Sequence, residues 1–568
     1  MEVITTQWAE FILRLPHYAS VLSTGWFVLA LAVILSVFLT PLSMSMAFRL
    51  GAVDTPNHRS VHAAITPRLG GVGICLSMLI AASFYLPFDR FTYGFLTGLL
   101  IIVVTGLLDD LNPMSHRIKF VGEILAAVAF VAISGVELPG IGNVLGFGEI
   151  NFGVFSFIIS IFCIVGLINA MNLSDGLDGL AGGMAVISLL FFSILAYKSG
   201  QHGTLVIALA LAGSLIGFLA YNSFPARLFM GDVGSLMIGY TCACIALSLA
   251  NSTVPFQAYP ITIALILAVP LLDTLIVMTV RIVKGTSPFA PDKTHLHHRL
   301  LDTGVSQNQA VSIVYMLMFT FCFFALLALK FKVPEYWQLL TACIVTAFFY
   351  RFIIYLANNP WKFVPNMLSL SKFFLKLEHE QHQRLLRVWH AVGAIMPNIA
   401  LAFYLLPIFF MGEWLLAALL LPIVCVILLI IFKTYNKRVL AMQHGLLYLV
   451  IFCLAFAYNT VLTVEIWSAY LLMLTSIALA WIILSLFVGH MRRQLSIHSV
   501  ETLFILVSWF VAFVLLPTFE GLEDVAVNMR LACIYSLPHL LISKLSMLSF
   551  GYADRRKRHR HEEPKTSD

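Results

Sequence analysis

Long apolar runs recur along this chain, and they limit the folds open to it more than any other feature. A helix needs roughly 20 apolar residues to cross the hydrocarbon core of a bilayer. About 17 such segments can be counted, centred near residues 32, 78, 100, 127, 161, 187, 212, 240, 269, 320, 346, 400, 422, 450, 477, 508 and 536. We therefore predict an all-α polytopic membrane protein with about 17 transmembrane helices.

Composition supports this prediction and narrows the possible functions. Hydrophobic residues make up 60% of the 568 positions and charged residues only 11%, whereas soluble domains are roughly one quarter charged. The nine cysteines lie in apolar runs without a CxxC or zinc spacing, so we expect apolar packing residues rather than disulfides or metal ligands. The net charge of +6 comes from loop lysines and arginines, and no nucleic-acid partner is expected.

The distribution of lysine and arginine predicts the orientation. If the N-terminus lies outside, the loops after odd-numbered spans are cytoplasmic, and they carry most of the basic residues, as the positive-inside rule requires. The C-terminus is then cytoplasmic, and the Gly-rich segment near 137–153 is predicted to form a small outside β-hairpin. Every polar motif described below falls on the cytoplasmic side.

The motifs occupy only part of the chain. Beyond Tyr350 the spans carry only Arg387, His390, Arg530 and His539 as unusual polar residues, which are functional candidates or side chains that reach the interface. We expect a catalytic membrane domain of about 11 spans over 1–357, a basic cytoplasmic linker over 358–387, a C-terminal membrane region of about 6 spans over 388–550, and a basic cytoplasmic tail over 551–568.

The most polar of the motifs runs from Asn169 to Gly183, between two apolar stretches. It places Asn172, Asp175 and Asp178 where one predicted helix ends and the next begins. Asp175 and Asp178 share a face if this turn is helical. A simple polar hairpin does not need so many groups able to bind a cation or a nucleotide, so we interpret the stretch as a binding site.

Two further acidic motifs end or begin predicted spans. Asp109 and Asp110 end the third span, where the helix dipole disfavours negative charge, so a divalent cation or the nearby Lys119 must compensate them. One of the pair would suit a general base, and an exposed acidic helix end is the alternative. Asp232 opens the eighth span, where it is an N-cap or a metal-phosphate ligand.

The loop that precedes Asp232 starts at Asn222 and contains Phe229. A loop aromatic can stack on a base, although Phe229 could equally be a core residue. Farther on, Asp292 to Arg299 is a dense cationic cluster with the histidines His295, His297 and His298. Because the spacing matches no zinc pattern, we favour a diphosphate clamp over a metal site.

Together these acids, asparagines, cations and an aromatic predict Mg²⁺-dependent phosphoryl transfer at the membrane face. One substrate is then water-soluble and the other is a lipid. Asp273 and Arg281, in and after the ninth span, line the interior or form a structural pair.

The motifs resemble a known family, the polyprenyl-phosphate N-acetylhexosamine-1-phosphate transferases of the glycosyltransferase 4 type. They occur in the family order across roughly residues 20–350, and the histidine motif resembles the bacterial branch that uses UDP-GlcNAc, as in O-antigen and enterobacterial common antigen initiation. The matching pieces are Thr66-Pro-Arg-Leu-Gly-Gly, Leu108-Asp-Asp, Asn172-Leu-Ser-Asp-Gly-Leu-Asp-Gly-Leu-Ala-Gly-Gly, Phe229-Met-Gly-Asp-Val-Gly-Ser and His295-Leu-His-His-Arg.

The resemblance implies transfer of GlcNAc 1-phosphate from UDP-GlcNAc to undecaprenyl phosphate in the bacterial inner membrane, with Mg²⁺, or Mn²⁺ in its place, as cofactor. It implies the following roles: Asp232 and Asn172 on the metal; Phe229, Asn222, Asp175 and Asp178 in the nucleotide pocket; Asp109, Asp110 and Lys119 at the lipid phosphate; and His295, His297, His298 and Arg299 on the sugar diphosphate. Asp175 and Asp178, like the Asp109–Asp110 pair, are also catalytic candidates.

Two departures from the family pattern leave alternatives open. Glu123 stands where glutamine is expected, and the spans after about residue 357 are extra, as a fused partner domain, a homodimerisation element or a regulator. The donor could instead be another UDP-N-acetylhexosamine or UDP-MurNAc-pentapeptide. A lipid-carrier transporter or a scaffold for glycan assembly is the alternative of another class.

Overall fold

The computed structural model describes residues 2–54, 65–252, 258–287, 294–358 and 499–510. The chain divides into two compact units, Met1–Asn358 and Asn359–Asp568. The first unit carries every motif named above and is described here by itself. The predicted C-terminal spans, linker and tail lie outside the described residues, apart from helix α19 (Ser499–Phe510).

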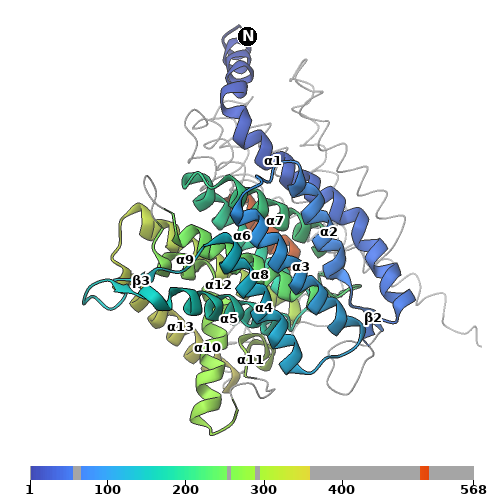
Figure 1. Ribbon diagram of the computed structural model, residues 1–568, viewed down its shortest axis with the longest axis vertical. Helices are drawn as coiled ribbons and strands as arrows, with labels where there is room; N and C mark the ends of the chain where they lie inside the picture. The colour runs from blue at the N-terminus through green and yellow to red at the C-terminus, as the bar shows by residue number, and fades with distance from the viewer. Residues whose placement is uncertain (1, 55–64, 253–257, 288–293, 359–498, 511–568) are drawn as a thin grey trace, which may run out of the picture. The chain divides into compact units, whose positions relative to one another are not determined.

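Helices dominate the first unit (Figure 1). Two short hairpins, β1–β2 and β3–β4, and a 3₁₀ turn, η1, connect them. The elements are α1 (Glu2–Leu50), β1 (Val53–Asp54), β2 (Thr66–Pro67), α2 (Gly70–Ser83), α3 (Arg90–Leu111), α4 (His116–Ser134), β3 (Gly140–Gly142), β4 (Ile150–Asn151), η1 (Gly153–Phe155), α5 (Ser156–Ser174), α6 (Leu180–Lys198), α7 (His202–Asn222), α8 (Gly231–Ala250), α9 (Pro260–Ile266), α10 (Ala268–Val283), α11 (Leu296–Asp302), α12 (Gln307–Lys330) and α13 (Glu335–Asn358).

Local sequence explains several helix boundaries. Asp89 caps α3 by accepting a hydrogen bond from the backbone N–H of Thr92 at 2.8 Å. Ser306 and Gln309 form a reciprocal capping box at the start of α12, which satisfies two backbone donors that the helix leaves free. Gly135 ends α4 in the left-handed conformation, which glycine adopts without steric cost.

Eight of the described helices are long and apolar enough to cross a membrane, and the bent pair α9–α10 makes a ninth. This result establishes a multi-pass helical membrane protein. All eleven spans predicted before residue 358 fall on helices, although α2, with 14 residues, is short. The total of about 17 spans, which rested on apolar length alone, and the orientation of the chain stay predictions.

The span predicted near residue 269 differs from expectation, because α9 and α10 meet at an angle of 90°. Pro270 has no backbone N–H and therefore cannot bond the carbonyl of Ile266. That carbonyl instead lies 3.0 Å from the hydroxyl of Ser188 on α6 and 3.5 Å from the thiol of Cys322 on α12. The neighbouring helices thus satisfy the carbonyl that the bend releases.

The helices α6, α7 and α8 form the centre of the unit. The share of buried residues in their most apolar windows is 94%, 83% and 89%, against 28% for α1 and 22% for α13. Helices that are apolar all round are expected in the interior or facing lipid. The outer helices expose large hydrophobic side chains such as Phe38, Leu100 and Phe348, as expected for a lipid-facing surface.

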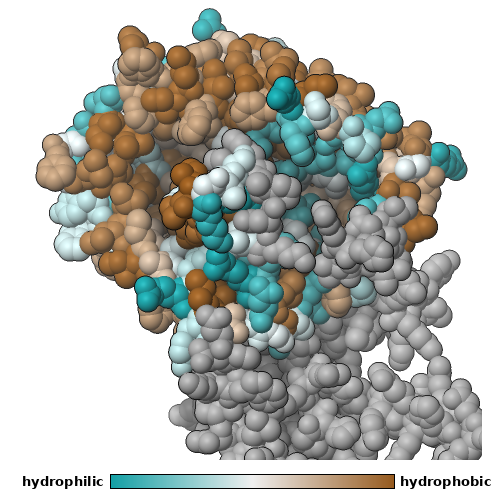
Figure 2. Space-filling view, turned by 90° about the horizontal axis from the view of Figure 1, so that it is seen from below, coloured by the Kyte–Doolittle hydropathy of each residue, from teal (hydrophilic) through white to brown (hydrophobic). Residues whose placement is uncertain are grey.

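One end of the bundle collects the motifs. At this end, loops connect the C-terminal ends of α1, α3, α5 and α7 to the N-terminal ends of α2, α4, α6 and α8. It is the lower end in Figure 1, towards which β2 and α11 lie. Figure 2 shows the unit from this side, with hydrophobic residues over its outer parts and hydrophilic residues gathered towards the middle, around a hollow. The helix ends therefore place the polar loops together.

The short hairpins differ in what they do. In β1–β2, Val53 pairs with Pro67 and Asp54 with Thr66, so this hairpin brings Asp54 beside the Thr66–Gly71 motif. The second hairpin, β3–β4, lies in the segment where the sequence predicts one. That it lies outside the membrane stays a prediction.

Candidate active site

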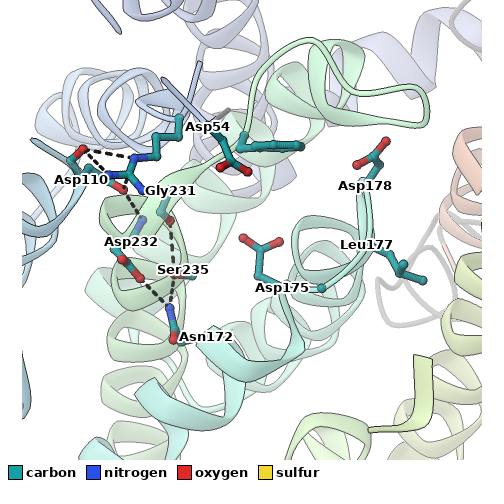
Figure 3. Close-up of a pocket in the computed structure, with 12 residues that line it drawn as sticks. Asp54, Asp110, Asn172, Asp175, Leu177, Asp178, Gly231, Asp232 and Ser235 are labelled. Atoms are coloured by element: carbon teal, nitrogen blue, oxygen red, sulfur yellow. Dashed lines mark hydrogen bonds and ion pairs between the residues drawn. The ribbon is translucent and has the colours of Figure 1, made fainter. Parts of the chain in front are cut away.

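A polar cavity of about 310 Å³ lies at the motif-bearing end of the bundle. Five aspartates line it, contributed by four different connections between helices (Figure 3). The complete lining is Asp54, Arg68, Asp110, Asn172, Asp175, Gly176, Leu177, Asp178, Phe229, Gly231, Asp232 and Ser235. The motifs that the sequence separates by as many as about 180 residues are thus assembled around one space.

The two acids at the end of α3 have different surroundings. The carboxylate of Asp110 accepts hydrogen bonds from the backbone N–H groups of Asp232, at 2.9 Å, and Val233, at 3.1 Å. It therefore caps the N-terminus of α8, where the helix dipole favours negative charge. Arg68 donates to the backbone carbonyl of Asp110 at 2.8 and 3.1 Å. Asp110 is buried, and both of its oxygens are engaged.

Gly231 makes this cap possible. Its φ is +68°, and a Cβ there would lie 2.1 Å from the carbonyl oxygen of Arg68 and 2.4 Å from Asp110 Oδ2. No side chain fits that space, so glycine is required both by conformation and by close approach. The Gly-Asp sequence in the eighth-span motif thus has a direct structural explanation.

Asp109 faces Lys119 instead of the cap. Its carboxylate accepts from the backbone N–H of Met114 at 2.6 Å and lies 3.4 Å from Lys119 Nζ. Lys119 also lies 2.5 Å from Asp232 Oδ1. The predicted compensation of Asp109 by Lys119 is therefore present, and the lysine joins two of the acidic motifs.

Asp232 and Asn172 are in contact through the amide nitrogen of Asn172. Asn172 Nδ2 lies 2.9 Å from Asp232 Oδ1 and 2.7 Å from Ser235 Oγ (Figure 3). The contact joins the end of α5 to the first turn of α8. A hard cation held by a carboxylate and an amide oxygen would have its ligands at this junction.

Asp175 and Asp178 face the cavity from the connection between α5 and α6. Asp178 is buried and accepts from the backbone N–H of Ala226 at 2.9 Å. Asn222 is also buried, and its amide bonds the backbone of Gly179 at 3.0 Å and of Leu228 at 2.9 Å. Asn222 lies behind the cavity wall and positions it, and its predicted contact with a nucleotide stays a prediction.

Phe229 lines the cavity and is held by backbone pairing. Its N–H donates to the carbonyl of Pro67 at 2.8 Å, and its carbonyl accepts from Gly70 at 2.9 Å. The backbone of the Thr66–Gly71 motif is thus hydrogen-bonded to the backbone of Phe229. This pairing explains why a motif that is weak in isolation belongs to the site.

The histidine motif reaches the same wall. A Cβ at Gly176 would lie 2.2 Å from His297 Nε2, so the imidazole packs directly on the backbone of Gly176. The ring of His297 is stacked at 5.8 Å with that of His295 and lies 4.3 Å from that of His298. Arg299 lies with its guanidinium carbon 5.7 Å from the centre of the Tyr350 ring.

Two pKa shifts describe the electrostatics outside the spans. Burial, followed by the charges of Asp232, Asp178 and Asp110, raises the pKa of Asp175 to about 7. Burial and the neighbouring His298 lower the pKa of His297 to about 3. The cavity therefore has an excess of negative charge, whereas His297 is a neutral ring near pH 7. This neutrality modifies the predicted cationic cluster, to which His297 contributes no charge.

Comparison with known proteins identifies the chain. The model of the protein family described as "Glycosyl transferase family 4" matches residues 92–250. A probable undecaprenyl-phosphate N-acetylglucosaminyl 1-phosphate transferase of Bacillus subtilis (strain 168) is 34% identical over 356 residues, which cover 62% of this chain and 96% of that protein. The chain belongs to glycosyl transferase family 4.

Other relatives in this family carry similar names. An undecaprenyl-phosphate alpha-N-acetylglucosaminyl 1-phosphate transferase of Yersinia pestis is 30% identical over 59% of this chain and 93% of its own length. A decaprenyl-phosphate N-acetylglucosaminephosphotransferase of Mycolicibacterium smegmatis is 32% identical over 58% of this chain and 88% of its own length.

The cavity also includes residues to which the sequence reasoning gave no role of their own. Asp54 contributes a fifth carboxylate, which points into the same space as that of Asp175 (Figure 3), and Ser235 bonds Asn172. Asp54 opens the polar loop that leads to the Thr66–Gly71 motif, and this position was the available signal. Its pairing with Thr66 across the short β1–β2 hairpin was not evident.

Glu123, the departure from the family 4 pattern, lies near this site. It is buried on α4, four residues after Lys119, and accepts a hydrogen bond from Asn169 Nδ2 at 2.5 Å. A glutamine could also accept that bond. The contact with α5 thus depends on an oxygen acceptor at this position and does not itself require the charge.

Proposed function

We propose that this protein transfers GlcNAc 1-phosphate from UDP-GlcNAc to undecaprenyl phosphate, giving undecaprenyl-diphospho-GlcNAc and UMP. An oxygen of the lipid phosphate forms a bond to the sugar-bearing phosphorus of the donor, and the bond from that phosphorus to the UMP oxygen breaks. The observation that carries the proposal is the assembly of the acidic motifs around one cavity at the end of a helical bundle, with the histidine motif packed against its wall at Gly176. The names of the relatives supply the substrates.

The residues around the cavity fit a Mg²⁺ or Mn²⁺ ion. The carboxylates and the Asn172 amide are oxygen donors, which these ions prefer. Within the described ranges, no three His, Cys, Asp or Glu side chains lie close enough to hold a metal alone. Mg²⁺ commonly takes only one or two carboxylates and completes its shell with water and substrate phosphate. Asp232 and Asn172 would hold the ion, which would stabilise negative charge on the diphosphate.

The acceptor side is proposed to involve Asp109 and Lys119. Lys119 is a cation set between Asp109 and Asp232, where a phosphate could approach its ammonium group. A phosphate monoester is already anionic near neutral pH and needs little activation. Both oxygens of Asp110 are occupied by the α8 cap, which supports direct attack by the lipid phosphate over a covalent intermediate at that residue.

The donor side is proposed to involve Phe229, Asp175, Asp178 and the histidine motif. Phe229 would stack on uracil, and Asp175 and Asp178 would border the nucleotide pocket. The histidine motif would contact the sugar diphosphate, with His298 and Arg299 beside the neutral His297. With the basic residues inside, this site faces the cytoplasm, where UDP-sugars are made, and the protein resides in the bacterial inner membrane.

The test is UMP release by the purified protein supplied with UDP-GlcNAc, undecaprenyl phosphate and Mg²⁺. We expect release that depends on both the lipid and the metal and that Asp232→Ala abolishes. A matched Asp89→Ala variant, at the far end of α3, should retain activity. Release from UDP-MurNAc-pentapeptide or another UDP-N-acetylhexosamine, but not from UDP-GlcNAc, would correct the donor. No release with any donor would refute the proposal.

A further inference from the structure

We propose that Asp273 is a positioning residue that fixes the histidine motif against the cavity, and the inference rests on the proposed function. Asp273 lies on α10, outside the cavity lining, and its side chain is only about 6% exposed. A carboxylate so deeply buried needs several hydrogen-bond donors to offset its lost hydration. The structure supplies three, from two other segments.

Each oxygen of Asp273 has defined partners. Oδ2 lies 2.8 Å from His295 Nδ1, and Oδ1 accepts from the backbone N–H of Leu296 at 2.8 Å. The hydroxyl of Tyr350, on α13, also donates to Oδ1. One carboxylate thus joins α10, the start of α11 and α13, and it holds the start of the histidine motif through the side chain of His295 and the backbone N–H of Leu296.

The contact with His295 determines more than its place. An ionised carboxylate can only accept hydrogen bonds, so the hydrogen of the imidazole must lie on Nδ1. In the neutral ring this leaves Nε2 with its lone pair, and the ring plane is fixed by the bond. The same arrangement orients histidines in metal and catalytic sites, where a carboxylate sets the tautomer.

The effect of Asp273 reaches the cavity through stacked rings. His295 stacks on His297 with an angle of 14° between their planes, and His297 packs on Gly176, which lines the cavity. Tyr350, which also bonds Asp273, contacts the last residue of the motif, because Arg299 lies over its ring. Loss of the Asp273 contact should therefore release the whole motif from the wall and leave the acidic motifs in place.

This geometry predicts a selective kinetic effect. The histidine motif is proposed to contact the donor, whereas Lys119 and Asp109 serve the lipid phosphate. A displaced motif should lower kcat/KM for UDP-GlcNAc and leave KM for undecaprenyl phosphate unchanged. General loosening of the bundle would alter both substrates and the melting temperature together, so the two explanations can be separated.

The decisive variant is Asp273→Asn in the full-length protein. Asparagine retains an oxygen for Leu296 and Tyr350 and presents an amide N–H to His295, which reverses the tautomer. We expect kcat/KM for UDP-GlcNAc to fall about 10- to 100-fold, the range found when the partner that orients a metal-bound histidine is removed. Thr279→Ala, an exposed position on the same helix, is the matched control and should match the unsubstituted protein.

A double-variant cycle identifies the route. If Asp273 acts through His295, Asp273→Asn should change kcat/KM by less than about twofold once His295→Ala is present. Fully multiplicative losses, or equal losses for donor and lipid, would overturn the inference. If Asp273→Asn does not fold, Tyr350→Phe takes its place and should give a smaller loss of about two- to tenfold, confined to the donor.

The outcome separates this inference from the proposed function. An unsubstituted protein that releases no UMP from any donor would refute the proposed function and the inference with it. Normal release by the unsubstituted protein, together with unchanged kinetics of Asp273→Asn and Tyr350→Phe, would refute the role of Asp273 alone.

Discussion

The adjacent acids Asp109 and Asp110 show how different two neighbouring side chains can be. One contacts a lysine at the edge of the acidic cluster, and the other caps a helix with both oxygens. Consecutive side chains on a helix point about 100° apart. The two carboxylates therefore cannot act together as a bidentate ligand for one cation. Their functions should separate on substitution.

Asp110→Asn should destabilise the protein, whereas Asp109→Asn should not. The amide of an asparagine at position 110 can accept from only one of the two backbone N–H groups of α8, and loss of a cap costs about 1–2 kcal/mol. We expect a lower melting temperature in detergent for Asp110→Asn and an almost unchanged one for Asp109→Asn, with activity reduced in both. Equal melting temperatures would contradict the cap.

The raised pKa of Asp175 predicts how metal activation depends on pH. With a pKa of about 7, Asp175 is mostly protonated at pH 6 and mostly charged at pH 8, so it attracts a cation better at the higher pH. The Mg²⁺ concentration for half-maximal activity should fall by up to about tenfold between these values. Asp175→Asn should remove this dependence, and a variant that retains it would show that another group is responsible.

Gly176 tests the contact between the histidine motif and the wall. In Gly176→Ala, the new methyl group would overlap His297 and displace its ring, and misplacement by about 1 Å can cost about 10²-fold in rate. We expect a loss of UMP release of that order. Gly166→Ala, on α5 with no atom within 4 Å of the added carbon, is the control. Equal activity of both variants would rule out the contact.

At the scale of elements, the α9–α10 bend depends on support from neighbouring helices. Ser188 lies 3.0 Å from the Ile266 carbonyl that Pro270 leaves free. Ser188→Ala should therefore lower the stability by about 1 kcal/mol, seen as a lower melting temperature. Ser193→Ala on the same helix, whose hydroxyl bonds only Leu190 at 2.6 Å, should have a smaller effect. The reverse order would refute this account of the bend.

The sequence predicted the elements and motifs well because apolar length and loop polarity are local properties. Helices occupy all the predicted spans before residue 358, and alternation of the chain through a bundle brings the motif loops to one end. Contacts such as Asp273 with His295 and Tyr350, or Asp110 with the first turn of α8, depend on packing between distant segments. Local patterns contain no information on those pairings, so the place of Asp54 in the cavity lining was missed.

For the whole molecule, the chain divides between Asn358 and Asn359, and the described residues that line the cavity all belong to the first unit. A unit with its own core can fold alone. We expect residues 1–358, purified alone, to release UMP within about threefold of the full-length rate. Folded but inactive protein would show that the remaining residues contribute to turnover, and a proportionate loss of folded protein would indicate a stabilising role instead.

Helix α11 lies between α10 and α12 in the chain, and His297 on Gly176 joins it to the acidic wall. We therefore expect substitutions within 285–304 that spare His295, His297, His298 and Arg299 to leave the packing of α3, α5 and α8 unchanged. If the proposed function holds, we expect this stretch to set donor preference while the acidic motifs serve the lipid phosphate. Divergence of donor preference among related enzymes would then require drift in one short stretch of the gene, and a laboratory exchange of that stretch is the shortest route to a new sugar.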